Sequence, residues 1–359
     1  MAQSTMADPA VQGAMTQDTA PASSSASTPA SSSAASYPAC WGGVDVSKDH
    51  LDVNCYPRPA HVRGATCLRA RNDAEGIARV LEHLQRLQVH AVVVESSGGY
   101  ERPLMHALHQ AQRTVSLVNP KRVRDYAHAL GKQAKTDPID ALVLARFGAD
   151  VRPAPTPPPP PGQEEREALV VRRRQLIQMR TAEKNRRQQT WEAAAQSSID
   201  TMLKVLDEQV AELDRLIEQS VKQDEEALAK EKELRKVVGI GPVVSRVLVT
   251  ELPELGTLDR GRIAALVGLA PFNHDSGKFK GQRAIGGGRF GVRCALYMAT
   301  LTATKANPVI KAHYQKLRSR GKAFKVAMVA CMRKFVIYLN QKMRELLSRR
   351  QREMAALPG

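Results

Sequence analysis

Four carboxylic acids stand at positions where an uncompensated negative charge is costly. Asp45 is central in a short apolar strand-like run, and Glu95 ends a continuous apolar, β-branched run. Asp137 and Asp140 follow, three residues apart, at the start of a segment with helical character. Like charges gathered at the ends of buried strands repel one another unless a cation neutralises them. Mg²⁺ or Mn²⁺ bound through these oxygens could assist the displacement of a phosphodiester oxygen.

Each of these acids also has a purely structural interpretation. Asp45 could begin a turn, and Asp137 could cap the helix that Pro138 starts. All four, however, stand at matching points of one β/α unit. We therefore predict that Asp45, Glu95, Asp137 and Asp140 are catalytic metal ligands.

A basic loop that contains several glycines surrounds Ser276. Its glycines would allow the backbone to approach a phosphate closely. The cations that we predict to bind nucleic acid in this loop are Lys278, Lys280, Arg283, Arg289 and Arg293. A serine hydroxyl is a weak nucleophile until a base, a metal or neighbouring cations stabilise its oxyanion. Composition alone therefore leaves open whether Ser276 is a nucleophile or a turn residue.

The run Gly239-Ile240-Gly241-Pro242 is flanked by helical signals on both sides. A short glycine turn between two helices exposes backbone N–H groups that can hold a phosphate. We predict that Gly239 and Gly241 contact nucleic acid in this way. A plain turn between helices is the alternative interpretation.

The positive charge of the chain is concentrated near its C-terminus. The formal net charge is +17, and the residues from Asp259 onward, with 21 lysines and arginines and four acids, account for all of it. Such an excess is typical of a protein that binds a polyphosphate, although a solvated basic surface is the simpler alternative. The five cysteines form no CxxC pair, which argues against a structural zinc site and a disulfide framework.

The acids at 45 and 95 must be positioned by a sheet. Hydrophobic patterning predicts strands separated by helices, in the order β-β-β-α-β-α-β-α, which indicates an α/β unit with a mixed sheet covered by helices. The predicted strands are 43–46, 50–56, 66–70, 91–94 and 115–118, and the first helix is 74–87.

Composition divides the chain further. We expect a disordered tail, a sheet domain, a stiff proline-rich linker, a helical coiled-coil connector and a mainly helical DNA-binding domain. Their bounds are 1–37, 38–152, 153–162, 163–236 and 237–350. A heptad seam from Ile199 to Ile217 predicts packing against another helix, in this chain or in a partner chain. Without a secretory signal or an apolar run of about 18 residues, we expect a cytoplasmic protein that does not enter a membrane.

Several sequence blocks together resemble the DEDD insertion-sequence transposases. In the N-terminal half they are 44–48, 94–100, 119–120 and 135–141, and in the C-terminal half 239–242, 269–271, 276–277 and 286–298. The resemblance covers about residues 40 to 345. It implies a RuvC-like (Holliday-junction-resolvase) form of the ribonuclease H fold for the N-terminal domain, followed by a second, serine-bearing transposase domain.

The resemblance also implies a mechanism and partners. Asp45, Glu95, Asp137 and Asp140 would hold the metal, and Ser276 would attack DNA to form a covalent phosphoserine link. The enzyme would be a homo-oligomer, a dimer or tetramer, in which the serine of one subunit completes the acidic site of another. A structured guide RNA would pair with the DNA of the element and of its target.

Two other functions stay open at this point. One is a RuvC-like, metal-dependent, structure-selective nuclease that forms no covalent intermediate, in which Ser276 only positions a phosphate. The other is a non-catalytic nucleic-acid-binding protein.

Overall fold

The computed structural model describes residues 39–131, 137–272, 275–276, 279–281 and 283–355. The chain divides between Pro157 and Pro158 into two compact units. Among the helices of the described residues, none is both long enough and apolar enough to cross a membrane.

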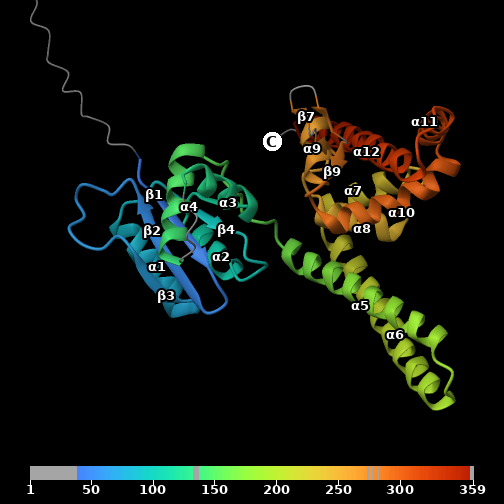
Figure 1. The fold of residues 1–359 in the computed structure, drawn as a ribbon, viewed down its shortest axis with the longest axis horizontal. Helices are drawn as coiled ribbons and strands as arrows, with labels where there is room; N and C mark the ends of the chain where they lie inside the picture. The colour runs from blue at the N-terminus through green and yellow to red at the C-terminus, as the bar shows by residue number, and fades with distance from the viewer. Residues whose placement is uncertain (1–38, 132–136, 273–274, 277–278, 282, 356–359) are drawn as a thin grey trace, which may run out of the picture. The chain divides into compact units, whose positions relative to one another are not determined.

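The first unit is built on a five-stranded mixed sheet with the strand order β3-β2-β1-β4-β5 (Figure 1). The strands are β1 (Trp41–Val46), β2 (His50–Tyr56), β3 (Leu68–Arg71), β4 (Ala91–Glu95) and β5 (Val115–Val118). β1, β2 and β3 pair antiparallel, whereas β4 joins β1 in parallel and β5 joins β4 in parallel. The central strand β1 therefore has one antiparallel neighbour, β2, and one parallel neighbour, β4.

Two helix layers cover the sheet. The helices are α1 (Ala74–Arg86), α2 (Arg102–Gln110), α3 (Pro120–Ala129) and α4 (Asp137–Val151). Because side chains alternate along a strand, Val44 and Val94 pack with α1 and α2 on one face. Trp41 and Val93 pack with α3 and α4 on the other. This arrangement confirms the predicted element order and the ribonuclease H-like fold.

The stretch after α4 covers the outer edge of the sheet. The Thr156 amide donates to the Val115 carbonyl at 2.8 Å, and the Leu117 amide donates to Thr156 Oγ1 at 2.9 Å. An uncovered edge strand presents unpaired backbone groups, and this segment satisfies some of them. Residues 153–156, which we expected to begin a linker, thus pack against β5.

The second unit begins with a helical hairpin, α5 (Gln163–Gln189) and α6 (Ala193–Gln223). Leu206 and Val210 of the predicted heptad seam pack with Leu176 of α5. Ion pairs join the two helices along their length, from Arg173–Asp214 through Arg180–Asp207 to Arg187–Asp200. The seam is therefore used within the chain, and the polypeptide reverses direction at Trp191, whose side chain is 87% exposed.

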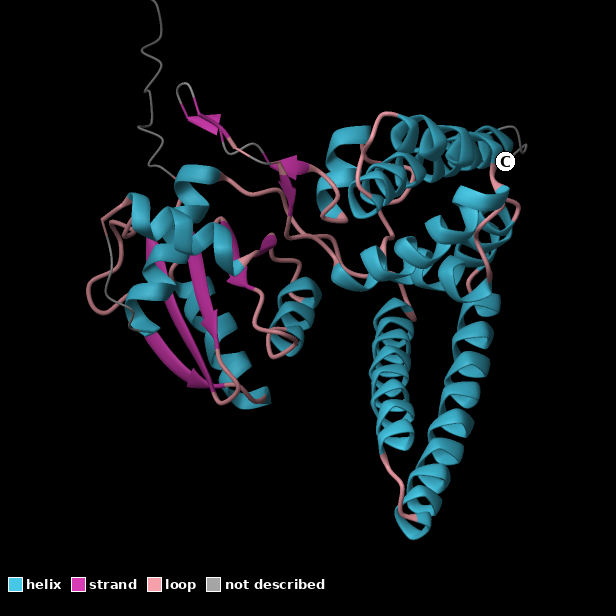
Figure 2. Cartoon of the chain, turned by 45° about the vertical axis from the view of Figure 1, so that its right-hand side comes forward, coloured by secondary structure: helices cyan, strands magenta, loops and turns pink. Residues whose placement is uncertain are grey.

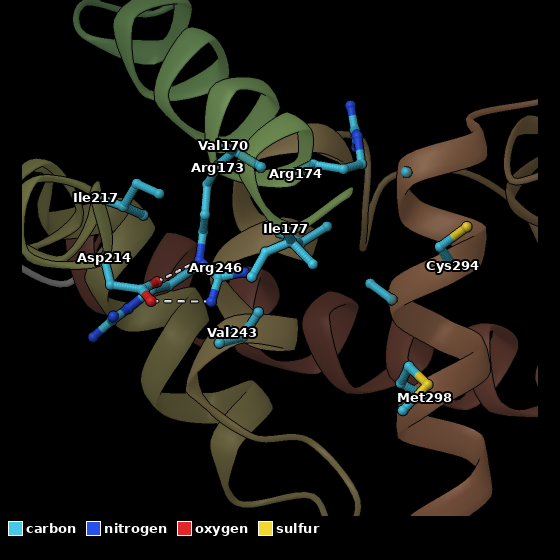
Figure 3. Close-up of a pocket in the computed structure, with 13 residues that line it drawn as sticks. Val170, Arg173, Arg174, Ile177, Asp214, Ile217, Val243, Arg246, Cys294 and Met298 are labelled. Atoms are coloured by element: carbon cyan, nitrogen blue, oxygen red, sulfur yellow. Dashed lines mark hydrogen bonds and ion pairs between the residues drawn. The ribbon is translucent and has the colours of Figure 1, made fainter. Parts of the chain in front are cut away.

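The hairpin meets the rest of the second unit around a cavity of about 240 Å³ (Figure 3). Apolar side chains such as Val170, Ile217 and Met298 line much of it. Beside the cavity, Arg174 of α5 forms an ion pair with Glu251, the last residue of α8, at 2.7 Å. This ion pair helps to connect the hairpin to the rest of the unit.

The remaining helices form the largest core of the chain. They are α7 (Glu225–Arg235), α8 (Pro242–Glu251), α9 (Arg260–Leu266), α10 (Phe290–Ala306), α11 (Pro308–Ser319) and α12 (Phe324–Ala355). Asp224 caps α7 through the Ala227 amide. Leu234 of α7 is buried in the same core as Leu248 and Phe335, so α7 belongs to this helical domain. The mainly helical C-terminal domain is as predicted.

Two short antiparallel ribbons interrupt the helices between α9 and α10 (Figure 2). The first pairs β6 (Pro271–Phe272) with β9 (Ala284–Ile285), and the second pairs β7 (Asp275–Ser276) with β8 (Phe279–Lys280). The basic loop of the sequence is thus a β-structured projection, with Ser276 on the second ribbon.

Candidate active site

Asp45 and Glu95 lie next to each other at one end of the sheet. The parallel register of β1 and β4 runs to Val44 opposite Val94, so the two acids occupy the next position on neighbouring strands. Both are half-buried. Asp45 is two residues from Gly43 and Glu95 is two residues from Val93, so each acid shares the sheet face of that residue.

Helix α4 brings Asp140 to the same corner. A Cβ atom on Gly43 would lie 2.2 Å from the Ala141 carbonyl oxygen, and one on Gly148 would lie 2.5 Å from the Trp41 ring. The helix therefore runs antiparallel to β1 across the face that carries Asp45. Its N-terminal turn, with Asp137 and half-buried Asp140, lies at the end of β1 where Asp45 stands. The side chain of Asp137 is outside the described part.

The absence of a side chain at Gly43 is what permits this close approach. We expect Gly43→Ala to push α4 away from β1 and to lower the free energy of unfolding by about 1–3 kcal/mol. The melting temperature of the full chain checks this, with Gly286→Ala as the control, because a Cβ at position 286 meets no atom within 4 Å. Equal melting temperatures for both variants would contradict the proposed packing.

A further acid, Asp52, belongs to this corner and is not apparent from the sequence. It is the register partner of Asp45 across β1 and β2, and it is only 6% exposed. Its Oδ2 lies 3.9 Å from Arg69 Nε on β3. The alternation in His50–Tyr56 places Asp52 and Asn54 on one face. The antiparallel pairing that sets Asp52 opposite Asp45, however, depends on the tertiary register.

Glu101 organises the turn that follows Glu95. Its carboxylate accepts hydrogen bonds from the Ser97 hydroxyl at 2.8 Å, the Gly99 amide at 2.8 Å and the Ser97 amide at 3.2 Å. Burial acts to raise the pKa of Glu101, but a hydrogen bond from its own backbone amide and those from Ser97 and Gly99 outweigh burial, so the pKa is lowered. Glu101 is thus a positioning residue for the loop beside the site. Nothing in the sequence indicates this role, because Glu101 lies six residues after Glu95 and matches no recognisable motif.

The lowered pKa of Glu101 gives a pH-dependent prediction. A carboxyl whose pKa is depressed on folding contributes stability above its unfolded pKa and loses it as the pH falls through the folded value. We expect Glu101→Gln to speed exchange of the Ser97 and Gly99 amide hydrogens at neutral pH. The increase should correspond to a loss of about 2 kcal/mol in the free energy of opening this turn. The difference from wild type should close as the pH falls below the ordinary carboxyl range. Exchange of these two amides measured by NMR checks this.

Glu75→Gln is the matched control for Glu101→Gln, because Glu75 is exposed in the first turn of α1. It should leave exchange at both amides unchanged. A difference between Glu101→Gln and wild type that persists in acid would show that the charge of Glu101 is not what orders the turn.

The described residues contain no group of three His, Cys, Asp or Glu side chains positioned to hold a metal ion. The side chain of Asp137, one of the four predicted ligands, lies outside that description. The candidate donors that the backbone brings to this corner, Asp45, Glu95 and Asp140, are all carboxylates, although their side chains as described do not meet in one group. Oxygen donors of this kind suit Mg²⁺ or Mn²⁺ and do not form the thiolate or imidazole set of a zinc site.

Ser276 belongs to the second unit. Its backbone pairs with Phe279 across β7 and β8, while its side chain and that of Lys280 are outside the described part, as is the whole of Lys278. The base of the projection is tightly packed, since a Cβ on Gly288 would lie 2.2 Å from the Gly268 amide nitrogen. This close backbone contact, which requires glycine, holds the two ends of the projection together.

Two of the predicted phosphate-binding arginines are engaged by protein groups at this base. Arg289 donates to both carboxylate oxygens of Glu254 at 2.5 Å. Arg293 donates to the Gly287 carbonyl at 2.6 Å and lies over the Phe290 ring. Both side chains therefore brace the projection, and any contact of theirs with phosphate stays a prediction. Arg283 is exposed.

The glycine turn between α7 and α8 has a packing role. Gly239 has φ of +106°, and a Cβ there would lie 2.9 Å from the Ala303 Cβ on α10. The Asn307 side chain donates to the Val238 carbonyl at 3.2 Å and so holds the turn. Gly241 precedes α8, and a Cβ at that position would meet no atom within 4 Å. Contact of Gly239 and Gly241 with a phosphate also stays a prediction.

The sequence matches two domains of IS110-type transposases. Residues 42–194 match a DEDD transposase domain of the IS110 type, described as a transposase. Residues 231–315 match the domain described as "Transposase IS116/IS110/IS902 family". The pilin gene-inverting proteins of Moraxella lacunata and Moraxella bovis are each 28% identical over 302 residues, which cover 82% of this chain and 92% of theirs.

Among solved structures, the chain is similar to a RuvC resolvase, described as "T. thermophilus RuvC in complex with Holliday junction substrate". The identity is 19%, the match covers 33% of this chain and 98% of that chain, and the TM-score is 0.26. The two domain matches are in the order of the two units, and they agree with the sequence blocks and with the ribonuclease H-like sheet. The chain belongs to the IS110-type family of DEDD transposases and is a DNA-rearranging enzyme.

Proposed function

We propose that this transposase cuts and rejoins DNA through a covalent serine intermediate at a divalent-metal site. The observation that carries the metal part is the convergence of Asp45, Glu95 and the N-terminal turn of α4 at one end of the sheet. The serine part rests on the family resemblance around Ser276 and on the basic loop in which it lies. The Moraxella relatives are named for inverting a pilin gene, and an inversion requires DNA strands to be cut and rejoined.

In the proposed reaction, Ser276 Oγ attacks a DNA phosphorus. A P–Oγ bond forms while the bond from phosphorus to a deoxyribose oxygen breaks, and the serine proton leaves as the departing oxygen gains one. Because one phosphoester replaces another, a second DNA hydroxyl can reverse the step and reseal the strand without an energy cofactor. A divalent ion at Asp45, Glu95, Asp137 and Asp140 would stabilise the charge on the reacting oxygens.

The partners follow from the same proposal. DNA binds as substrate, both at the element ends and at the target. A structured guide RNA pairs with both, and a homo-oligomer, a dimer or tetramer, combines the acids of one subunit with Ser276 of another. The excess of lysine and arginine after residue 259 would suit either nucleic acid.

An adduct assay with the wild-type chain tests the proposal. Protein, labelled DNA carrying the element junction, and RNA transcribed from the flank of the element are incubated with Mg²⁺ or with EDTA. A protein–DNA band that survives denaturation, needs Mg²⁺ and grows on adding the RNA is the expected result. Cleavage without such a band would instead support a nuclease that uses metal-activated water.

A further inference from the structure

The basic charge of the C-terminal domain is unevenly compensated. No Asp or Glu occurs from Ser276 to Arg344, a stretch that contains sixteen lysines and arginines. Outside α11 and the start of α12, several cations of this domain have protein partners. Arg289 pairs with Glu254, Arg349 with Glu233, and Arg344 donates to the Leu258 carbonyl.

The situation differs around α11 and the turn that leads from it into α12, two helices that are in contact (Figure 1). The α11–α12 basic surface is defined as five exposed cations: Lys311 and Lys316 of α11, Arg320 and Lys322 of the turn that follows it, and Lys325 of α12. Arg318 of α11 is also exposed, but it donates to the Lys322 carbonyl and is not counted. Within the described part of the chain, none of these five side chains forms an ion pair or a side-chain hydrogen bond. Uncompensated like charges on neighbouring stretches of chain raise the electrostatic potential over the surface and attract a polyanion.

His313 of α11 is subject to this positive field. Two lysines act on it, Lys316 of the same helix and Lys334 of α12. Burial lowers the pKa of His313, and repulsion from Lys334 and Lys316 lowers it further. An anion held by these lysines would oppose that repulsion.

We propose that the α11–α12 basic surface is a docking site for the sugar–phosphate backbone of duplex DNA, separate from the loop that carries Ser276. α11 has 12 residues and so extends about 18 Å, enough to face several successive phosphates of one strand. Surfaces that bind single strands combine charge with several stacking aromatics. Phe324 is the one exposed aromatic side chain among the described residues 308–326, which favours a duplex. The inference rests on the DNA-rearranging activity of the chain and is independent of the serine mechanism.

The test measures binding of a short labelled duplex to the full chain over about 0.05–0.2 M salt, without RNA. The surface variant is Lys311→Ala, Lys316→Ala and Lys325→Ala combined. The control variant is Lys184→Ala, Lys204→Ala and Lys232→Ala combined, which removes the same charge from exposed lysines on α5, α6 and α7. We expect the surface variant to bind about 10-fold or more weakly and to reduce the slope of log Kd against log salt by about 2 to 3.

The control variant should retain the wild-type affinity and slope. Equal losses in both variants would overturn the proposal, because net charge alone would then explain binding. A loss confined to RNA, measured in a parallel titration, would also overturn it. The assay measures duplex binding without RNA and needs no strand cleavage, so a failure of the covalent mechanism would not be confused with a failure of this proposal.

A second readout comes from His313 in the wild-type chain. Its pKa, followed by NMR of the imidazole carbon-bound protons, should rise when duplex DNA saturates the protein. The reason is that phosphates would offset the field of Lys316 and Lys334. An unchanged pKa at saturation would place the DNA elsewhere and refute this docking site.

Discussion

Replacing Asp45 by asparagine is expected to reduce DNA strand cleavage by about 1,000-fold or more, while binding of the DNA is retained. The amide would keep the size of the side chain but would remove one negative charge from the corner shared with Glu95 and Asp140, where we propose that the metal binds. A loss of about 4 kcal/mol in transition-state stabilisation corresponds to a factor of about 1,000 in rate. Initial rates of cleavage of the element junction, measured across a Mg²⁺ titration, give this number.

Asp49→Asn is the matched control for Asp45→Asn. Asp49 is an exposed acid in the turn between β1 and β2, four residues from Asp45, and the same chemical change there should leave the cleavage rate unchanged. Asp52→Asn is expected to have a smaller effect than Asp45→Asn, because Asp52 faces Arg69 and acts on the site through the register. Wild-type rates for Asp45→Asn would remove Asp45 from the metal site.

Replacing Ser276 by alanine is expected to abolish the covalent protein–DNA adduct and to lower strand cleavage by about 10⁴-fold. The alanine lacks the oxygen that forms the new bond to phosphorus, and removal of a nucleophile commonly costs several orders of magnitude. Denaturing gels of labelled junction DNA report the adduct and the cleaved strand together. The Asp45→Asn protein should also lack the adduct, since both groups serve the same step.

The two outcomes for Ser276→Ala separate the proposed mechanism from its nearest alternative. Cleavage that persists without an adduct would identify a hydrolytic nuclease and leave Ser276 as a phosphate contact. Ser198→Ala, an exposed serine on α6, controls for the loss of a hydroxyl and should form the adduct normally. Both serine variants should retain duplex binding.

Part of the candidate site could be predicted because it depends on local patterning. The apolar run ending at Glu95 and the short strand around Asp45 are read directly from hydrophobic alternation and β-branching. Their carboxyl ends meet once the strands pair in parallel, which the β-α-β order indicates. Asp137 and Asp140 begin a helix that Pro138 initiates, as its fixed φ favours.

Other features were decided by contacts between segments far apart in the chain. Asp52 becomes part of the site only through the antiparallel register that sets it opposite Asp45. The heptad seam of α6 could pack against a helix of this chain or of a partner chain. Because the polypeptide reverses direction at Trp191, α5 is the helix that packs against it. In the sequence, Arg289 and Arg293 cannot be told apart from unpaired loop cations. In the structure, Arg289 pairs with Glu254 and Arg293 donates to the Gly287 carbonyl.

The sequence by itself thus determined the order of strands and helices, the family, and the four acids proposed to hold the metal. Each of these is encoded in short motifs or in periodicities of two and 3.6 residues. The tertiary structure alone decided how close α4 lies to β1, which cations are paired, and which are left on α11 and α12. These properties depend on packing at Gly43 and on ion pairs between segments far apart in the chain, and such long-range contacts have no signature in the local sequence.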